Sequence, residues 1–205
     1  MVGSSVSEKP RPSPGLFRSP RRLRDNRHFT GHYSPMTANP FRWTFRAQCL
    51  LGFAVCAALL AFALYTQYYQ ALVPCPLCIF QRVAFAALGL VFLLAGLHAP
   101  RGAGGRRAWG VLALVAAAAG LYVAGRHVWI QHLPADQVPM CGPDLGFLLD
   151  AMPVTSVIRT VLTGAGECAK VDWTFLGLSM PEWSLGWFVA LTLWVGYVMF
   201  RKPRR

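Results

Sequence analysis

Four cysteines have a spacing and a setting suited to thiol–disulfide chemistry. Cys75 and Cys78 form a Cys-x-x-Cys motif, and Cys141 and Cys168 follow in a later polar stretch. Two residues between thiols close a small, often reactive ring in which one sulfur is commonly held as the thiolate. We expect a helix to start just after Cys78, and a helix N-terminus favours a thiolate. Arg82, one turn further along, adds positive charge or donates hydrogen bonds to an oxygen-rich ligand.

Other roles for the Cys-x-x-Cys motif are half of a zinc site, a haem attachment and a structural disulfide. No second Cys-x-x-Cys is present, so we expect no metal. Ile79 instead of histidine follows the motif, which disfavours haem. A structural disulfide stays open, and four cysteines allow three pairings. Cys49 and Cys56 lie seven residues apart inside an apolar run, where a thiol is usually a small apolar filler.

The elements that must position these cysteines are four apolar stretches, which cover about 47–69, 79–97, 109–130 and 183–200. Each approaches the ~20 residues that a helix needs to cross a bilayer core of about 30 Å. Helix is the only plausible state for isolated spans, because lipid offers no partner to free backbone groups. The sequence therefore predicts an all-α integral membrane protein, a four-transmembrane-helix bundle that occupies residues 44–200.

The composition agrees with a membrane bundle. Apolar residues make up 55% of the chain, charged residues only 14%, and the formal net charge is +12. The basic residues lie in the flanks and one short loop, so we expect no nucleic-acid partner, although an RNA-binding tail is the alternative. Residues 1–43 are rich in Pro, Ser and Arg, a composition that predicts a disordered basic tail. The short tail 201–205 is also basic, and Met36 is a possible alternative start.

Charge predicts the orientation of the spans. Both tails and the loop with Arg101, Arg106 and Arg107 are basic, and an excess of lysine and arginine marks the cytoplasmic side. The segments 70–78 and 131–182 then face the other side, and the second of them holds six of the eight acidic residues. Cys75, Cys78, Cys141 and Cys168 all fall on this non-cytoplasmic side, where disulfides persist.

A short helix is expected inside the long segment 131–182. Val154, Val157, Ile158, Val161 and Leu162 recur at helical spacing, and Gly164 can end the helix. Such an amphipathic helix is too short to span. It lies in the membrane interface with its apolar face down, or it packs as a loop segment on the bundle.

The sequence resembles the disulfide bond formation protein B (DsbB) family in three blocks. They are Pro-Cys-Pro-Leu-Cys-Ile-Phe-Gln-Arg at 74–82, Gly-Arg-His-Val-Trp-Ile-Gln-His at 125–132, and Gly-Glu-Cys-Ala-Lys at 166–170 with the Trp173 to Trp183 segment after it. The likeness covers about residues 45 to 200 and leaves out the N-terminal tail. Two cysteine blocks in matching topology make it specific.

The resemblance implies a bacterial inner-membrane thiol:quinone oxidoreductase. Such an enzyme reoxidises a periplasmic dithiol oxidase of the DsbA type, a thioredoxin-fold partner, and passes the electrons to the quinone pool. Both termini would be cytoplasmic, the redox cysteines would face the periplasm, and the short helix would be interfacial in the second periplasmic loop. The electron acceptor would be ubiquinone or menaquinone.

The resemblance also assigns roles by position. Cys75–Cys78 matches the quinone-proximal disulfide and Cys141–Cys168 the loop disulfide that meets the partner. Arg82 matches an arginine at the quinone site. The other matches to the quinone site are His132, with His127 as a rival, and Gln67.

Three other functions stay open. The chain could be a same-fold paralogue dedicated to one secreted enzyme, or a quinone reductase related to vitamin K epoxide reductase. It could also be a scaffold whose disulfides only brace the outer loop.

Overall fold

The computed structural model describes residues 40, 43–134, 136–138, 140, 142 and 145–201. Most of the expected N-terminal tail, the C-terminal residues 202–205 and Cys141 lie outside the described residues. The predictions of a disordered basic tail and of a role for Cys141 are therefore not tested by the structure.

Four long helices make up the protein: α1 (Phe45–Tyr69), α2 (Pro76–His98), α3 (Ala103–Gln131) and α6 (Met180–Phe200). All four are long and apolar enough to cross a membrane. The prediction of a four-helix membrane bundle is confirmed. Each helix begins two to six residues before the span expected from hydropathy.

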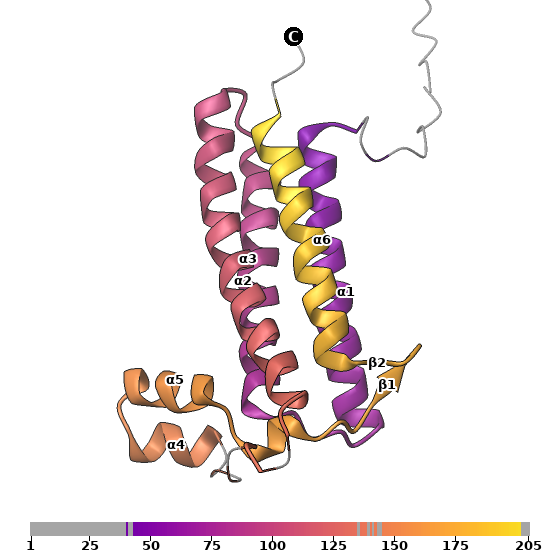
Figure 1. Ribbon diagram of the computed structural model, residues 1–205. Helices are drawn as coiled ribbons and strands as arrows, with labels where there is room; N and C mark the ends of the chain where they lie inside the picture. The colour runs from indigo at the N-terminus through magenta and orange to yellow at the C-terminus, as the bar shows by residue number, and fades with distance from the viewer. Residues whose placement is uncertain are drawn as a thin grey trace, which may run out of the picture. The chain divides into compact units, whose positions relative to one another are not determined.

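The helices stand side by side, with α1 packed on α2, α2 on α3, and α3 on α6 (Figure 1). Small residues allow these close approaches, which is how helices associate in lipid. A Cβ atom at Gly120 of α3 would lie 2.2 Å from the Phe188 ring of α6. Cys49 and Cys56 are buried and their Cβ atoms face glycines of α2, so both thiols pack as small apolar groups in the bundle core.

Local sequence sets the helix starts. Thr44 accepts a hydrogen bond from the Ala47 amide at 3.3 Å and caps α1. Ser179 and Glu182 form a capping box at the start of α6. Cys75 is the N-cap of α2, and Pro76 takes the first helical position, where its missing N–H costs nothing. The expectation that α2 starts after Cys78 was therefore wrong by three residues, and Cys78 lies in the first turn.

The long connection before α6 holds α4 (Leu145–Ala151), α5 (Val154–Thr163), the 3-10 helix η2 (Gly166–Ala169) and the strands β1 (Thr174–Phe175) and β2 (Leu178–Ser179). β1 and β2 pair antiparallel, with Thr174 opposite Ser179. These elements gather at the end of the bundle where α1 ends and α2 begins (Figure 1). They form a cap over that end.

The expected amphipathic helix is present as α5. Its buried residues Val157 and Val161 belong to a second apolar cluster with Leu77, Ile130 and Cys168. Arg126 of α3 donates hydrogen bonds to the carbonyl oxygens of Leu162 and Thr163, at 3.0 and 2.8 Å. Apolar contacts and this arginine thus hold α5 on the bundle. Its position in a membrane interface stays a prediction.

Candidate functional site

The Cys-x-x-Cys motif lies at the start of α2, at the capped end of the bundle. Cys75, in extended conformation at the N-cap, places its Sγ 3.4 Å from the Sγ of Cys78. Both are free thiols, as is Cys168. The two sulfurs are therefore in direct contact, half-buried at the junction of the helices and the cap.

Cys168 reaches the same point from η2. Its side chain is buried, and it lies close enough to Cys75 for a hydrogen bond between the thiols. That hydrogen bond and burial raise the pKa of the Cys168 thiol, so this sulfur keeps its proton beside Cys75. Three of the four predicted redox cysteines are thus brought together. Cys141 lies outside the described residues, and its disulfide with Cys168 stays a prediction.

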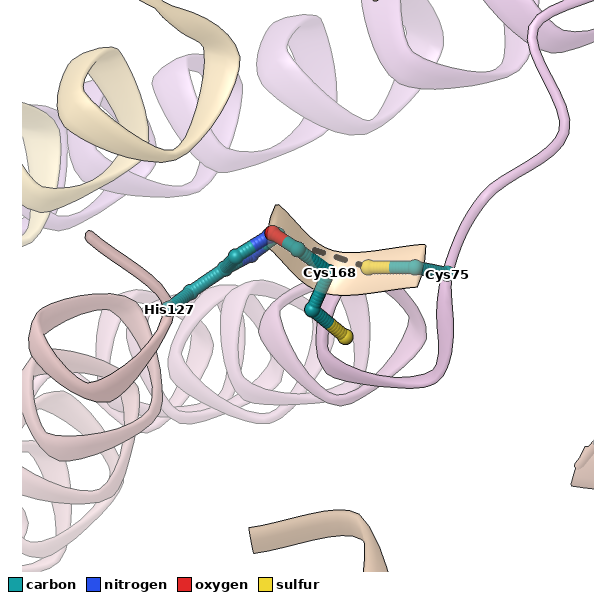
Figure 2. A group of neighbouring side chains, drawn as sticks. All are labelled: Cys75, His127 and Cys168. Carbon is teal, nitrogen blue, oxygen red and sulfur yellow. Dashed lines mark hydrogen bonds between the residues drawn. The ribbon is translucent and has the colours of Figure 1, made fainter. Parts of the chain in front are cut away.

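His127 of α3 is the buried centre of the hydrogen bonds around Cys75. Its Nδ1 lies 3.1 Å from Gln81 Nε2, and its Nε2 lies 3.1 Å from the carbonyl oxygen of Cys168. The same Nε2 is 3.7 Å from Cys75 Sγ. Figure 2 shows Cys75 and His127 reaching toward each other beside the Cys168 backbone. If the Gln81 side-chain amide donates a hydrogen bond to Nδ1, the proton of the ring lies on Nε2. The Nε2–H then donates to the Cys168 carbonyl oxygen and points toward the Cys75 sulfur.

Arg82, one turn after Cys78, is held by two acceptors on α1. It donates a hydrogen bond to Gln67 Oε1 and another to the carbonyl oxygen of Ala63, the latter at 3.0 Å. Gln67 thus contacts Arg82, but it is not among the described residues that line the two cavities beside Arg82. The pair joins α1 to α2 close to the Cys-x-x-Cys motif.

An apolar cavity of about 270 Å³ opens beside Cys78 and Arg82. It lies among α1, α2, α6 and the β1–β2 hairpin. Its wall includes the aromatic side chains Phe62, Phe85, Trp173, Phe175, Trp183 and Trp187. Phe62 and Trp173 meet edge to face, with ring centroids 5.9 Å apart. A mainly apolar cavity with a thiol and a guanidinium at its edge suits a flat, apolar ring that carries polar oxygens.

A second, more polar cavity of about 400 Å³ lies on the loop side of Cys78. Cys75 and His127 line it, and Cys78, Arg82 and Trp173 line both cavities. The Cys-x-x-Cys motif therefore separates an apolar chamber between the helices from a polar one beneath the loop.

His132 lies apart from this arrangement. It is the C-cap residue of α3 and exposed, with Nδ1 2.9 Å from the Val128 carbonyl oxygen and Nε2 3.9 Å from Glu182 Oε1. It lines neither of the two cavities, as far as the described residues define them. His127 lines the polar cavity, so of the two histidines it is the one that contacts the cysteines.

Four apolar helices with three converging thiols at one end define the class: an integral membrane protein with a thiol redox site. A family model described as disulfide bond formation protein DsbB matches residues 45–198. The chain is 60% identical over 169 residues to disulfide bond formation protein B of Xanthomonas campestris pv. campestris (strain 8004), 82% of this chain and 98% of that protein. It is 52% identical over 167 residues to the protein of that name from Xylella fastidiosa (strain 9a5c), 82% and 96% of the two chains. The chain therefore belongs to the DsbB family of disulfide bond formation proteins, as its cysteine blocks predicted.

Proposed function

We propose that this protein is a thiol:quinone oxidoreductase of the bacterial inner membrane. It reoxidises a periplasmic, thioredoxin-fold dithiol oxidase of the DsbA type, and the electron acceptor is ubiquinone or menaquinone. Arg101 lies in the short link between α2 and α3, and Arg106 and Arg107 lie in the first turns of α3, at the end of the bundle opposite the cysteines. This charge distribution supports a cytoplasmic position for that end and a periplasmic one for the thiols.

One observation carries the proposal: the sulfurs form a chain that ends at the apolar cavity. Cys168 contacts Cys75, Cys75 contacts Cys78, and Cys78 lines the cavity between the helices. A quinone dissolves in the hydrocarbon and the partner in water, so a relay between them must lie where the two phases meet. The end of the bundle under the cap is such a place.

The proposed reaction begins in the loop. A thiolate of the reduced partner attacks Cys141 of the Cys141–Cys168 disulfide, and the second partner thiol then releases the oxidised partner. This step leaves Cys141 and Cys168 reduced. Cys168 then attacks Cys75 of the Cys75–Cys78 disulfide and releases Cys78 as a thiol. Cys141 attacks Cys168 of the resulting Cys168–Cys75 bond, which restores the Cys141–Cys168 disulfide and leaves Cys75 and Cys78 reduced.

The second half returns Cys75 and Cys78 to the disulfide. Two electrons pass from these thiols to the quinone through Cys78, and two protons complete the quinol. The quinone is bound by the aromatic wall of the apolar cavity, with Arg82 donating hydrogen bonds to a quinone oxygen. Because the guanidinium is fixed by Gln67 and Ala63, its direction is set before the quinone enters.

The test is quinone reduction by the purified chain with a reduced thioredoxin-fold donor, with ubiquinone and menaquinone analogues in parallel. Cys78→Ser is expected to abolish quinol formation, and Cys141→Ser to abolish oxidation of the donor while the quinone still binds. Cys49→Ala is the matched control, because this buried thiol lies in the core of the bundle away from both cavities. Full turnover by Cys78→Ser would contradict the proposal.

A further inference from the structure

Three potential metal ligands from separate parts of the chain converge at the redox site. Sγ of Cys75, a ring nitrogen of His127 and Sγ of Cys168 all lie within 4.8 Å of one another. They come from the N-cap of α2, from α3 and from η2. The spacing of these residues in the sequence gave no sign of a metal site, because the fold alone brings them together.

Two separations from the Cys75 sulfur are close to those in a tetrahedral zinc site. Zn–S bonds of about 2.3 Å and Zn–N bonds of about 2.0–2.1 Å place sulfur about 3.6 Å from nitrogen and about 3.8 Å from a second sulfur. Cys75 Sγ lies 3.7 Å from His127 Nε2 and 3.4 Å from Cys78 Sγ. Cys78 is thus a candidate for the fourth ligand, and its sulfur, which lies outside the group of three, must move toward His127 and Cys168 to bind the same ion.

The surroundings also suit a bound cation. His127 and Cys168 are almost fully buried, with 2% and 1% of their surface exposed. A histidine that binds metal through Nε2 ordinarily donates its Nδ1–H to an oxygen. Gln81 lies at that nitrogen, and turning its amide by half a rotation presents Oε1 as the acceptor without displacing the side chain. His127 Nε2 would then bind the metal and give up its contact with the Cys168 carbonyl oxygen.

We propose that the reduced form of this protein binds one Zn²⁺ ion through Cys75, Cys168 and His127, with Cys78 as the fourth ligand. Three thiolates and one imidazole in tetrahedral geometry favour Zn²⁺ among the common divalent cations. The thiols give up their protons to solvent on binding, and no sulfur changes oxidation state. A disulfide at Cys75 or Cys168 removes these ligands. Zinc therefore binds only after reduction, and it holds the relay in the reduced state.

The experiment compares the reduced and oxidised forms of the full chain in detergent. The protein is reduced with a phosphine, freed of reductant without air, and titrated with Zn²⁺ in competition with a chromophoric chelator. One tightly bound ion is expected for each reduced chain and none for the chain after oxidation with diamide. Equal binding by the two forms would overturn the proposal. This comparison needs no mutation, so misfolding cannot affect it.

Variants then test the ligands. His127→Gln and Cys168→Ser are each expected to weaken zinc binding at least about tenfold. His132→Gln is the matched control, because it removes an exposed histidine near the end of the same helix, and it should bind zinc as the unchanged chain does. Cys141→Ser should also retain the ion. Unchanged affinity in His127→Gln, or loss of the site in Cys141→Ser, would show that the ligand set is wrong.

A spectroscopic and a stability measurement complete the test. Co²⁺ in place of Zn²⁺ should give the intense thiolate-to-metal absorption of a tetrahedral site in the reduced chain, and this absorption should weaken in Cys168→Ser. Zinc should raise the Tm of the reduced chain and leave that of the oxidised chain unchanged. None of these measurements needs quinone or a partner protein, so a failure of the proposed oxidoreductase function would leave their outcome intact.

Discussion

Replacing Gln67 with leucine tests whether Arg82 must be held from α1 to bind the quinone. The leucine has nearly the same size but cannot accept the hydrogen bond that Arg82 Nη1 donates to Gln67 Oε1. The second bond, from Nη2 to the Ala63 carbonyl oxygen, would remain. The guanidinium should therefore stay near the cavity but lose its fixed direction.

The size of the effect follows from the lost interaction. A hydrogen bond to a charged group contributes about 1.5–3 kcal/mol. Arg82 is half-buried and can still reach water, so we expect the lower end of this range. A loss of about 1.4 kcal/mol corresponds to a tenfold change in affinity. We expect the KM for quinone to rise about tenfold in Gln67→Leu, with kcat and the KM for the protein donor little changed.

The assay is steady-state quinone reduction, with quinone and the reduced donor varied separately. Gln70→Leu is the matched control: Gln70 is the exposed residue after α1, and the described part of the chain shows no contact of its side chain with Arg82. An unchanged quinone KM in Gln67→Leu would refute the role given to the Gln67–Arg82 pair. An equal rise in Gln70→Leu would show that the effect is not specific to the pair.

Three further predictions concern the sulfurs and the packing. In single-turnover measurements with the oxidised chain, Cys78→Ser should still accept electrons from the donor at the loop disulfide but form no quinol. Cys49→Ala and Cys56→Ala should each keep kcat within about twofold, because these thiols only fill the bundle core; a large loss in either would place a buried thiol in the relay. Gly120→Ala should lower the free energy of unfolding by about 1–3 kcal/mol, the usual cost of overpacking, because the added Cβ would lie 2.2 Å from the Phe188 ring. Gly125→Ala on the same helix is the control, because a Cβ there meets nothing within 4 Å. Thermal unfolding in detergent checks this pair, and equal Tm values would contradict the packing argument.

The four spans could be predicted because length and apolar character decide whether a helix crosses a bilayer. The start of α2 could have been predicted better, since Pro76 is a known signal for the first helical position. The β1–β2 hairpin was missed because its turn residues, Leu176 and Gly177, have φ of 54° and 80°. A leucine in this left-handed conformation is unusual, and the sequence lacks the Asn-Gly or Asp-Gly pair that marks such turns.

The site was predicted in its parts but not in its arrangement. The chemistry of Cys75, Cys78 and Cys168 is visible in the sequence, whereas the assignment of Arg82 and Gln67 to one site came from the family resemblance. The contact of Cys75 with Cys168 and the burial of His127 between them depend on how η2 folds back over the start of α2 and the end of α3. No spacing in a single sequence encodes such a contact between distant segments.

The position of Cys75 at the N-cap of α2 bears on the speed of the proposed relay. Its backbone is extended, and its carbonyl oxygen accepts the first helical hydrogen bond from the Ile79 amide at 3.2 Å, but its side chain makes no capping bond to the described part of α2. Because the Cys75 sulfur already contacts both Cys78 and Cys168, a small turn about its Cα–Cβ bond is enough to exchange one partner for the other while every turn of the helix stays intact. Rotamer changes of this kind take picoseconds to nanoseconds where a side chain is free to turn. The pace of turnover should accordingly be set by partner docking, sulfur exchange or quinol departure, and not by any unwinding of the protein.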